Sequence, residues 1–116
     1  MSNLNFKTVP NFESGKMYSV CLRGARSYDK TKPISIFTNN QGAMVDSEFS
    51  ALPSCEAFVI SNNQYIFESL NDSDCLDNYD FDAKTKDGLL NAMNNVYTNF
   101  DTREIVTILK FKILWT

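Results

Sequence analysis

Five aspartates fall between positions 72 and 82, and they interleave with a leucine and two aromatic residues. Carboxylates crowded this closely attract cations and basic surfaces, and aromatic side chains provide apolar anchors at protein interfaces. Binding to a partner is therefore the chemistry that these residue types favour. The residues that we expect to contact a partner are Asp72, Asp74, Asp77, Tyr79, Asp80, Phe81 and Asp82.

Four interpretations of this acidic stretch stay open. The first is a solvated loop, and the second is a segment that docks on a basic protein surface. In the third, the aspartates imitate the phosphates of DNA and so bind a nucleic-acid-binding protein. The fourth is calcium binding, for which Asp72 with Asp74 and Asp80 with Asp82 are suggestive pairs. Neither pair continues with the glycine and glutamate of an EF-hand loop, so we predict no metal site.

A basic stretch gives an alternative site of a different kind. Four cations and one aromatic side chain lie close together in the chain, and such a group can hold phosphates and stack on a base. The competing explanations are a solvated loop or pairing with the acidic stretch. A pI near 4.8 argues against a dedicated nucleic-acid binder, so we expect direct binding of nucleic acid to be weak or absent. The residues of this alternative site are Arg23, Arg26, Tyr28, Lys30 and Lys32.

Residues for catalysis are scarce. The chain has no histidine, which removes the commonest general base near neutral pH and the commonest metal ligand. Its three cysteines, Cys21, Cys55 and Cys75, are far apart, so we expect free thiols rather than a disulfide framework or a zinc ribbon. No glycine-rich phosphate-binding loop occurs. We therefore predict a protein that is not an enzyme and needs no cofactor.

Charge divides the chain into three blocks. Residues 1–32 hold six basic and two acidic side chains, residues 33–83 hold nine acidic side chains and no Lys or Arg, and residues 84–116 hold five basic and three acidic. The net charge of −3 thus conceals blocks of +4, −9 and +2. A block of one sign projects a field that draws cationic partners and repels nucleic acid.

The composition is that of one globular domain of 116 residues, with 43% hydrophobic residues. The chain has no apolar run of about 20 residues to cross a membrane and no apolar signal region at its start, so we expect a cytoplasmic protein. Thirteen asparagines against four glycines resemble the usage of small accessory proteins of AT-rich viral genomes, which would place it in a host cytoplasm. This is an association of composition and names no family.

Strand and turn signals fill the first two thirds of the chain. After an irregular lead-in over residues 1–15, residues 16–22 have the composition of a strand. Residues 34–38 and 43–45 flank an Asn-Asn-Gln-Gly turn signal and predict one hairpin. Residues 57–60 and 65–67 flank Ser-Asn-Asn-Gln and predict a second. In that hairpin Phe58, Ile60, Tyr65 and Phe67 would share the buried face, with a base-stacking platform as the alternative.

A helix and a long strand complete the prediction. Asp87 can cap a helix that runs to Asn99, with an apolar stripe of Leu89, Met93, Val96, Tyr97 and Phe100. Residues 104–115 are predicted to form a strand. Its core-facing residues would be Leu109, Phe111, Ile113 and Trp115. Lys110 and Lys112 on its other face would protect a sheet edge, or the strand would pair with its symmetry mate in a homodimer.

The pattern predicts an α+β domain, in which an antiparallel sheet of five or six strands, with two hairpins and a long C-terminal strand, carries one amphipathic helix on a face. The function that the sequence favours is that of an accessory or inhibitor protein whose acidic face occupies a basic site on a host protein. A nucleic-acid-binding module that uses residues 23–32 is one alternative. A structural or assembly protein that uses the terminal strand is another.

Overall fold

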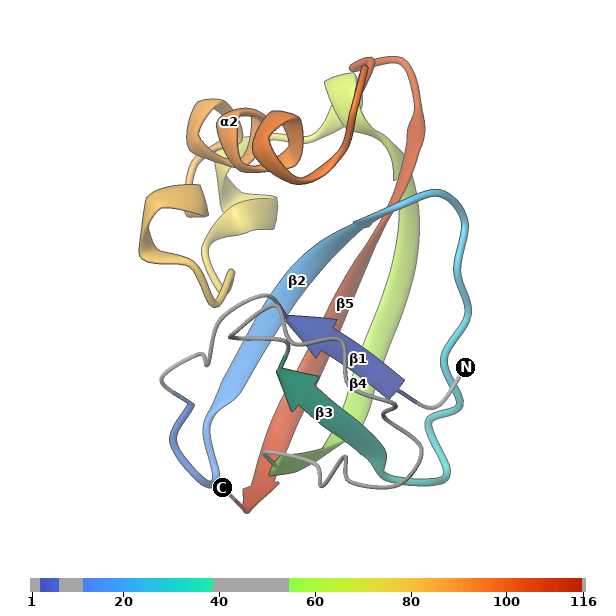
Figure 1. Cartoon of the computed structure of the whole chain (residues 1–116), viewed down its shortest axis with the longest axis vertical. Helices are drawn as coiled ribbons and strands as arrows, with labels where there is room; N and C mark the ends of the chain where they lie inside the picture. The colour runs from blue at the N-terminus through green and yellow to red at the C-terminus, as the bar shows by residue number, and fades with distance from the viewer. Residues whose placement is uncertain (1–2, 7–11, 39–54, 116) are drawn as a thin grey trace.

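Five strands and one α-helix form the regular structure of the computed structural model, which describes residues 3–6, 12–38 and 55–115 (Figure 1). The expected α+β class is confirmed: one helix packs on a sheet that is antiparallel except at one edge. The elements are β1 (Asn3–Phe6), β2 (Met17–Arg23), β3 (Ile34–Thr38), β4 (Cys55–Ile66), the 3₁₀ helices η1 (Phe67–Ser69), η2 (Asp72–Cys75) and η3 (Phe81–Ala83), α2 (Lys86–Val96) and β5 (Ile105–Trp115).

The strands lie in the order β1-β3-β4-β5-β2. Neighbours from β3 to β2 are antiparallel, whereas β1 joins the edge in parallel with β3, with Leu4 opposite Ile36. The antiparallel part therefore has four strands, not the five or six that the sequence predicted. In Figure 1 β1 and β3 lie in front of β2 and β5, and Leu4 and Ile36 pack with Val20 and Leu109. The sheet thus curls over one of its own faces.

The N-terminal region corrects the expected irregular lead-in. Residues 3–6 form β1, because they find a partner strand much later in the chain, a contact for which no local signal exists. β3 confirms the first strand of the first predicted hairpin. The turn at 39–42 and the second strand at 43–45 of that hairpin lie outside the described residues.

The second predicted hairpin is wrong, because β4 runs unbroken through it. The Ser-Asn-Asn-Gln sequence at 61–64 does not turn but continues along β5, with Asn62 opposite Leu109. Asparagine is poor in strands, yet a long partner strand supplies a continuous ladder of hydrogen bonds. Pairing with β5 thus overrides the local turn signal.

The burial predicted along β4 is wrong for Phe58 and Ile60 but holds near the end of the strand, where Tyr65 packs against the cluster that buries Phe67. A β-bulge lies between Val59 and Ser61, where the pairing with β5 shifts its register. Ala57 and Val59 are buried, whereas Phe58 and Ile60 are exposed. The expected cluster of Phe58 and Ile60 with the buried Phe67 does not form, and two large apolar side chains are left at the surface.

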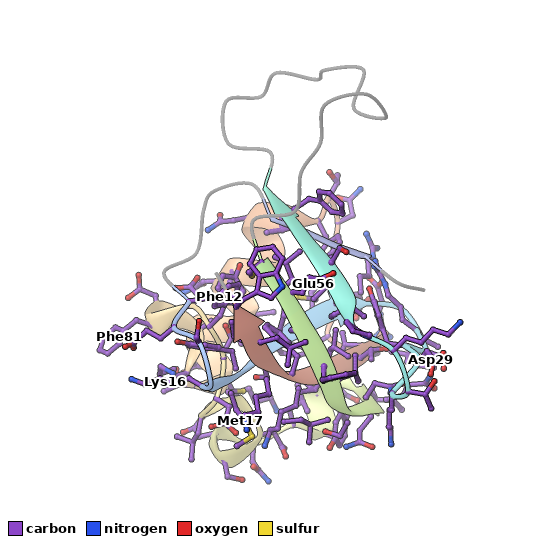
Figure 2. The ribbon with its side chains drawn as sticks, turned by 90° about the horizontal axis from the view of Figure 1, so that it is seen from below. Phe12, Lys16, Met17, Asp29, Glu56 and Phe81 are labelled. Carbon is purple, nitrogen blue, oxygen red and sulfur yellow. The ribbon has the colours of Figure 1, made fainter. Side chains whose placement is uncertain are left out.

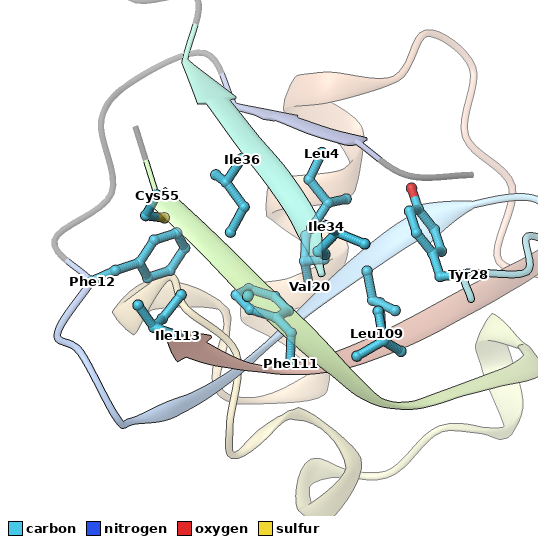
Figure 3. Close-up of a cluster of buried hydrophobic side chains, with 12 residues drawn as sticks. Leu4, Phe12, Val20, Tyr28, Ile34, Ile36, Cys55, Leu109, Phe111 and Ile113 are labelled. Carbon is cyan, nitrogen blue, oxygen red and sulfur yellow. The ribbon is translucent and has the colours of Figure 1, made fainter. Parts of the chain in front are cut away.

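Side chains are buried on both faces of the sheet. The curled β1–β3 pair encloses one cluster, which Figure 3 shows. It consists of Leu4, Phe12, Val20, Tyr28, Ile34, Ile36, Cys55, Ala57, Val59, Leu109, Phe111 and Ile113. Helix α2 and the η helices cover the second cluster on the opposite face. It consists of Cys21, Phe67, Leu70, Cys75, Ala83, Leu89, Met93 and Val106.

Helix α2 is shorter than predicted. Its N-cap is Thr85, whose Oγ1 accepts a hydrogen bond from the Gly88 amide at 3.1 Å, so Asp87 lies inside the first turn. The helix ends at Val96, and Asn99 has a φ of 57°. Within the predicted apolar stripe Leu89 and Met93 are buried, Tyr97 and Phe100 are partly buried, and Val96 is exposed. No helix in the described ranges is long and apolar enough to cross a bilayer.

Strand β5 confirms most of its predicted stripe and corrects its predicted role. Leu109, Phe111 and Ile113 are fully buried, but Trp115 is partly exposed. The strand lies inside the sheet, because β2 pairs with one of its edges and β4 with the other. Neither protection of an edge by Lys110 and Lys112 nor a homodimer made by edge pairing of this strand fits that position. The assembly role proposed for the strand loses its basis with it.

Candidate protein-binding surface

Residues 71–83, here called the acidic segment, are folded onto the body of the protein. The side chains of Cys75 and Ala83 are buried beneath it. The segment also pairs with the outer edge of β2, where Ser19 N donates to Asp77 O at 2.7 Å and Tyr79 N donates to Ser19 O at 2.9 Å. Two buried anchors and a strand-like pairing hold the segment in a defined shape.

Two aspartates of the segment fix its own backbone, and a third ties it to helix α2. Asp74 accepts a hydrogen bond from the Asn71 amide at 3.0 Å in a capping box, and Asp80 accepts one from the Asp82 amide at 3.0 Å. Asp72 accepts one from the first amide of α2 at 2.8 Å. Each of these carboxylates has another oxygen or lone pair to offer outward, because a carboxylate accepts up to about four hydrogen bonds.

Lysines surround the segment without neutralising most of it. Lys110 forms an ion pair with Asp77 at 2.8 Å. The ammonium of Lys84 donates to the backbone carbonyls of Leu76 and Asn78, at 3.0 and 2.9 Å, and reaches no carboxylate. Among the described residues Asp77 is thus the one aspartate of the segment with an ion pair. The surface keeps a strong negative charge.

Large apolar side chains stand between these charges. Phe81 is 82% exposed, and Figure 2 shows it at the outer margin of the molecule. Leu76 is 60% exposed. The Tyr79 side chain is partly held in place. Its ring packs edge-on against that of Phe12, with the ring centroids 6.2 Å apart, and burial raises the pKa of its hydroxyl. The acidic segment therefore presents two free apolar side chains and one fixed aromatic ring.

The exposed apolar surface continues onto the sheet. Helix α2 covers only part of its face, and the uncovered part bears Lys110 and Lys112 in alternation along β5. The strand register aligns Met17 of β2, Lys112 of β5 and Phe58 of β4 in one row. We call this surface the open half-face. It consists of Met17, Phe58, Ile60, Lys110, Lys112 and Leu114, and the four apolar members are exposed.

Two observations join the open half-face to the acidic segment. The Asp77–Lys110 ion pair spans the boundary, and Ser19 of β2 pairs with Asn78. The sequence prediction missed this half-face because it assigned Phe58 and Ile60 to the core. The alternation of Lys110 and Lys112 with the buried side of β5 was the available signal, since residues opposite a lysine in a neighbouring strand share its face.

The structure does not bring the predicted basic site together. Arg23 forms a bidentate ion pair with Glu104, at 2.6 and 2.9 Å, and its remaining nitrogen donates to Thr98 O at 3.1 Å. Tyr28 is 3% exposed and belongs to the core in Figure 3, so it offers no ring face to a base. Arg26 Nε donates to the Arg23 carbonyl. Lys30 and Lys32 are exposed.

The thiols are buried and protonated. Burial raises the pKa of Cys21 to about 12, with a smaller contribution from Cys75. Burial, with the charges of Asp74 and Asp72, raises the pKa of Cys75. All three cysteines are free. Within residues 3–6, 12–38 and 55–115, no three acidic or thiol side chains converge as metal ligands would.

Comparison with protein-family models, with curated proteins and with solved structures finds no match for this chain.

Proposed function

We propose that this protein acts by binding another protein through the acidic segment, and that it is not an enzyme. Its role is that of an accessory or inhibitor protein whose acidic face occupies a basic or nucleic-acid-binding site on a host protein, in the manner of a DNA mimic. The observation that carries the proposal is Phe81, which is 82% exposed in a segment with five aspartates. Burial of an aromatic side chain of this size by a partner makes the free energy of binding more favourable.

The form of the segment supports binding more than mere solvation. A solvated loop has no need of buried anchors, whereas Cys75 and Ala83 fix this segment so that Phe81 and Leu76 stand outward. Preorganised apolar anchors lose little conformational entropy on binding. The surrounding carboxylates steer a basic partner toward them and disfavour acidic partners. The charge and the anchors thus favour the same class of partner.

The site of action that we propose is the cytoplasm, or a host cytoplasm if the protein is viral. Three buried free thiols suit a reducing compartment. The preference for a protein partner over nucleic acid rests on the positions of the basic residues. Arg23 is bound to Glu104 and Tyr28 is buried, so the described residues of the predicted basic site offer little that could bind phosphates and bases together.

The test uses Phe81→Ala, which removes the main anchor, and Asp82→Asn, which removes a carboxylate without a hydrogen bond or ion pair among the described residues. The control is Ile105→Ala, which removes an exposed apolar side chain at the start of β5. A partner is first captured from lysate with the wild-type protein and identified by mass spectrometry. Its affinity for each variant is then measured by calorimetry at two salt concentrations.

We expect Phe81→Ala to weaken the purified complex about tenfold or more, as truncation of an interface anchor does, and Ile105→Ala to leave it unchanged. The affinity of the wild-type protein should fall as salt is added, because salt screens the attraction between the carboxylates and a basic partner. If the partner binds nucleic acid, a labelled oligonucleotide should be displaced from it. Equal affinities for wild type and the Phe81 variant would contradict the proposal, as would tight binding of the oligonucleotide by this protein itself.

A further inference from the structure

A cavity of about 160 Å³ lies at the outer edge of β2, between that strand, helix α2 and residues 78–83. Leu4 and Val20 line it from the enclosed face of the sheet, and Leu89 and Met93 line it from beneath the helix. Its walls are mostly apolar, with Asp80 of the acidic segment among the lining residues. The cavity is therefore a neighbour of the proposed binding surface.

The edge of β2 at this cavity is not fully paired. The register with β5 and the outward bonds of Ser19 imply that Ser19, Cys21 and Arg23 direct their backbone groups away from β5. Ser19 is paired with Asp77 and Tyr79, and the Arg23 amide donates to the Tyr97 hydroxyl at 3.4 Å. Along this edge no other described residue forms a hydrogen bond with the Cys21 amide or carbonyl, although Cys21 is only 6% exposed.

Unpaired backbone groups beside an apolar cavity are unusual, because buried amides and carbonyls are nearly always hydrogen-bonded. On the same edge, the backbone amide and carbonyl of Ser19 are hydrogen-bonded to the neighbours of Asn78. Asn78 therefore lies beside Ser19 as a residue of a parallel strand would. The chain leaves this path after Tyr79 and enters η3. The next position along the edge, beside Cys21, is where the cavity lies.

We propose that the cavity receives an extended segment of the basic partner, with one apolar side chain inside it and the main chain paired with Cys21. This inference rests on the proposed function and names how the partner is gripped. The volume suits a single aliphatic or aromatic side chain, since a cavity of about 150 Å³ accommodates benzene. A peptide supplies an amide and a carbonyl at the spacing of a strand edge, as in recognition by strand addition. Asp80 and the other aspartates favour Lys or Arg beside the inserted residue.

The probe is the blocked peptide Lys-Lys-Leu-Lys-Lys, titrated into the full-length ¹⁵N- and methyl-labelled protein and followed by NMR. A peptide with Ser in place of Leu tests the apolar side chain without any change to the protein. The variant Ala92→Met fills the cavity from α2, and Asn91→Met places the same side chain at the neighbouring exposed position of the helix. Indole is a third ligand, which has an apolar ring but no peptide backbone.

We expect the Leu peptide to shift the Cys21 amide and the Met93 methyl resonances, and the Ser peptide to bind about tenfold more weakly or worse. Ala92→Met should weaken binding of the Leu peptide by a similar factor, and Asn91→Met should leave that binding unchanged. An unmoved Cys21 amide, equal binding of the two peptides, or indole binding without a peptide response would overturn the inference.

The two proposals fail separately. Phe81→Ala should not alter binding of the short peptide, because Phe81 does not line the cavity. If the peptide result is negative while Phe81→Ala still weakens the purified complex, only the inference about the cavity falls. If Phe81→Ala has no effect on the complex, the proposed function falls whatever the peptide does.

Discussion

The carbonyl oxygen of Asp82 occupies the space into which a side chain on Gly88 would project. A Cβ on Gly88 would come within 2.0 Å of that oxygen and within 3.2 Å of Thr85 Oγ1. The first turn of α2 therefore rests directly on the backbone of η3. Because η3 belongs to the acidic segment, this contact makes the helix and the candidate binding surface one structural unit.

Gly88→Ala should destabilise the protein, although alanine normally favours a helix over glycine by up to about 1 kcal/mol. The opposing contact is with backbone, which cannot rotate away, and overpacking of this kind costs about 1–3 kcal/mol. Urea unfolding followed by circular dichroism measures the change. Asn91→Ala, at an exposed position of the same helix, is the matched control and should be neutral or slightly stabilising. A Gly88 variant as stable as wild type would show that η3 can move aside freely.

The elements with a clear local pattern were the ones that the sequence predicted. The alternation of Leu109, Phe111 and Ile113 with lysines marks β5, and the spacing of Leu89 and Met93 marks α2, because burial of one face imposes a period on the chain. The errors arose where distant pairing decides the conformation. Residues 61–64 do have a local preference for a turn. The long strand β5 nevertheless pairs with them, and this pairing decides their conformation. β1 depends wholly on its contact with β3.

The candidate surface was predicted in part. Exposure of Phe81 and Tyr79 among aspartates was expected from their charged neighbours. Exposure of Phe58 could not be predicted, because it depends on how far α2 and the η helices extend over that face of the sheet, which no local pattern specifies. The cavity beside Cys21 has no sequence signal either. It exists because the chain leaves the edge of β2 after Tyr79, a feature of the tertiary path alone.

Phe111→Ala should come close to unfolding the protein. The ring is fully buried and meets Phe12 edge-on at 5.6 Å, in the interior strand of the sheet. Truncation of a buried phenylalanine costs about 3–5 kcal/mol, which approaches the whole stability of a small domain. Thermal melting should show loss of the cooperative transition, as should deletion of residues 109–116. Lys112→Ala, at the adjacent exposed position of the same strand, should melt like wild type. Cooperative melting of the deletion variant at an unchanged temperature would contradict the assignment of β5 to the core.

Stability should fall with pH in acid, partly through Glu104 and Asp101. Hydrogen bonds from Arg23 lower the pKa of Glu104 below its ordinary 4.5, and those from Arg103 lower the pKa of Asp101 from 3.8 to about 2. A carboxyl whose pKa is lower in the folded state stabilises the fold above its unfolded pKa and loses that effect as the pH falls through its folded pKa. The melting temperature should therefore decline between about pH 5 and pH 2.

Glu104→Gln isolates the contribution of the Glu104 carboxylate, which accepts hydrogen bonds from Arg23 and from the Asp101 amide, to this decline. The variant should melt below wild type at pH 7, and the gap should narrow toward pH 2, because wild-type Glu104 is then protonated as well. Melting followed by circular dichroism across this range measures the gap. Glu13→Gln, which removes the exposed ion pair with Lys16, serves as the control and should follow the wild-type curve closely. If the difference in melting temperature between Glu104→Gln and wild type stays constant with pH, the effect of the substitution would come from altered packing and not from the lost charge.

The cysteines should be nearly inert in the folded protein and fully reactive after unfolding. Only the thiolate attacks a disulfide reagent, and burial raises the pKa of all three thiols, that of Cys21 to about 12. Titration with Ellman's reagent at pH 8 should therefore be slow for the native protein and should reach three equivalents in denaturant without reductant. Recovery of a single thiol would reveal a disulfide. Fast native labelling that maps to Cys21 would mean that the edge of β2 opens to solvent, and the Lys-Lys-Leu-Lys-Lys peptide should then slow that labelling if it pairs there.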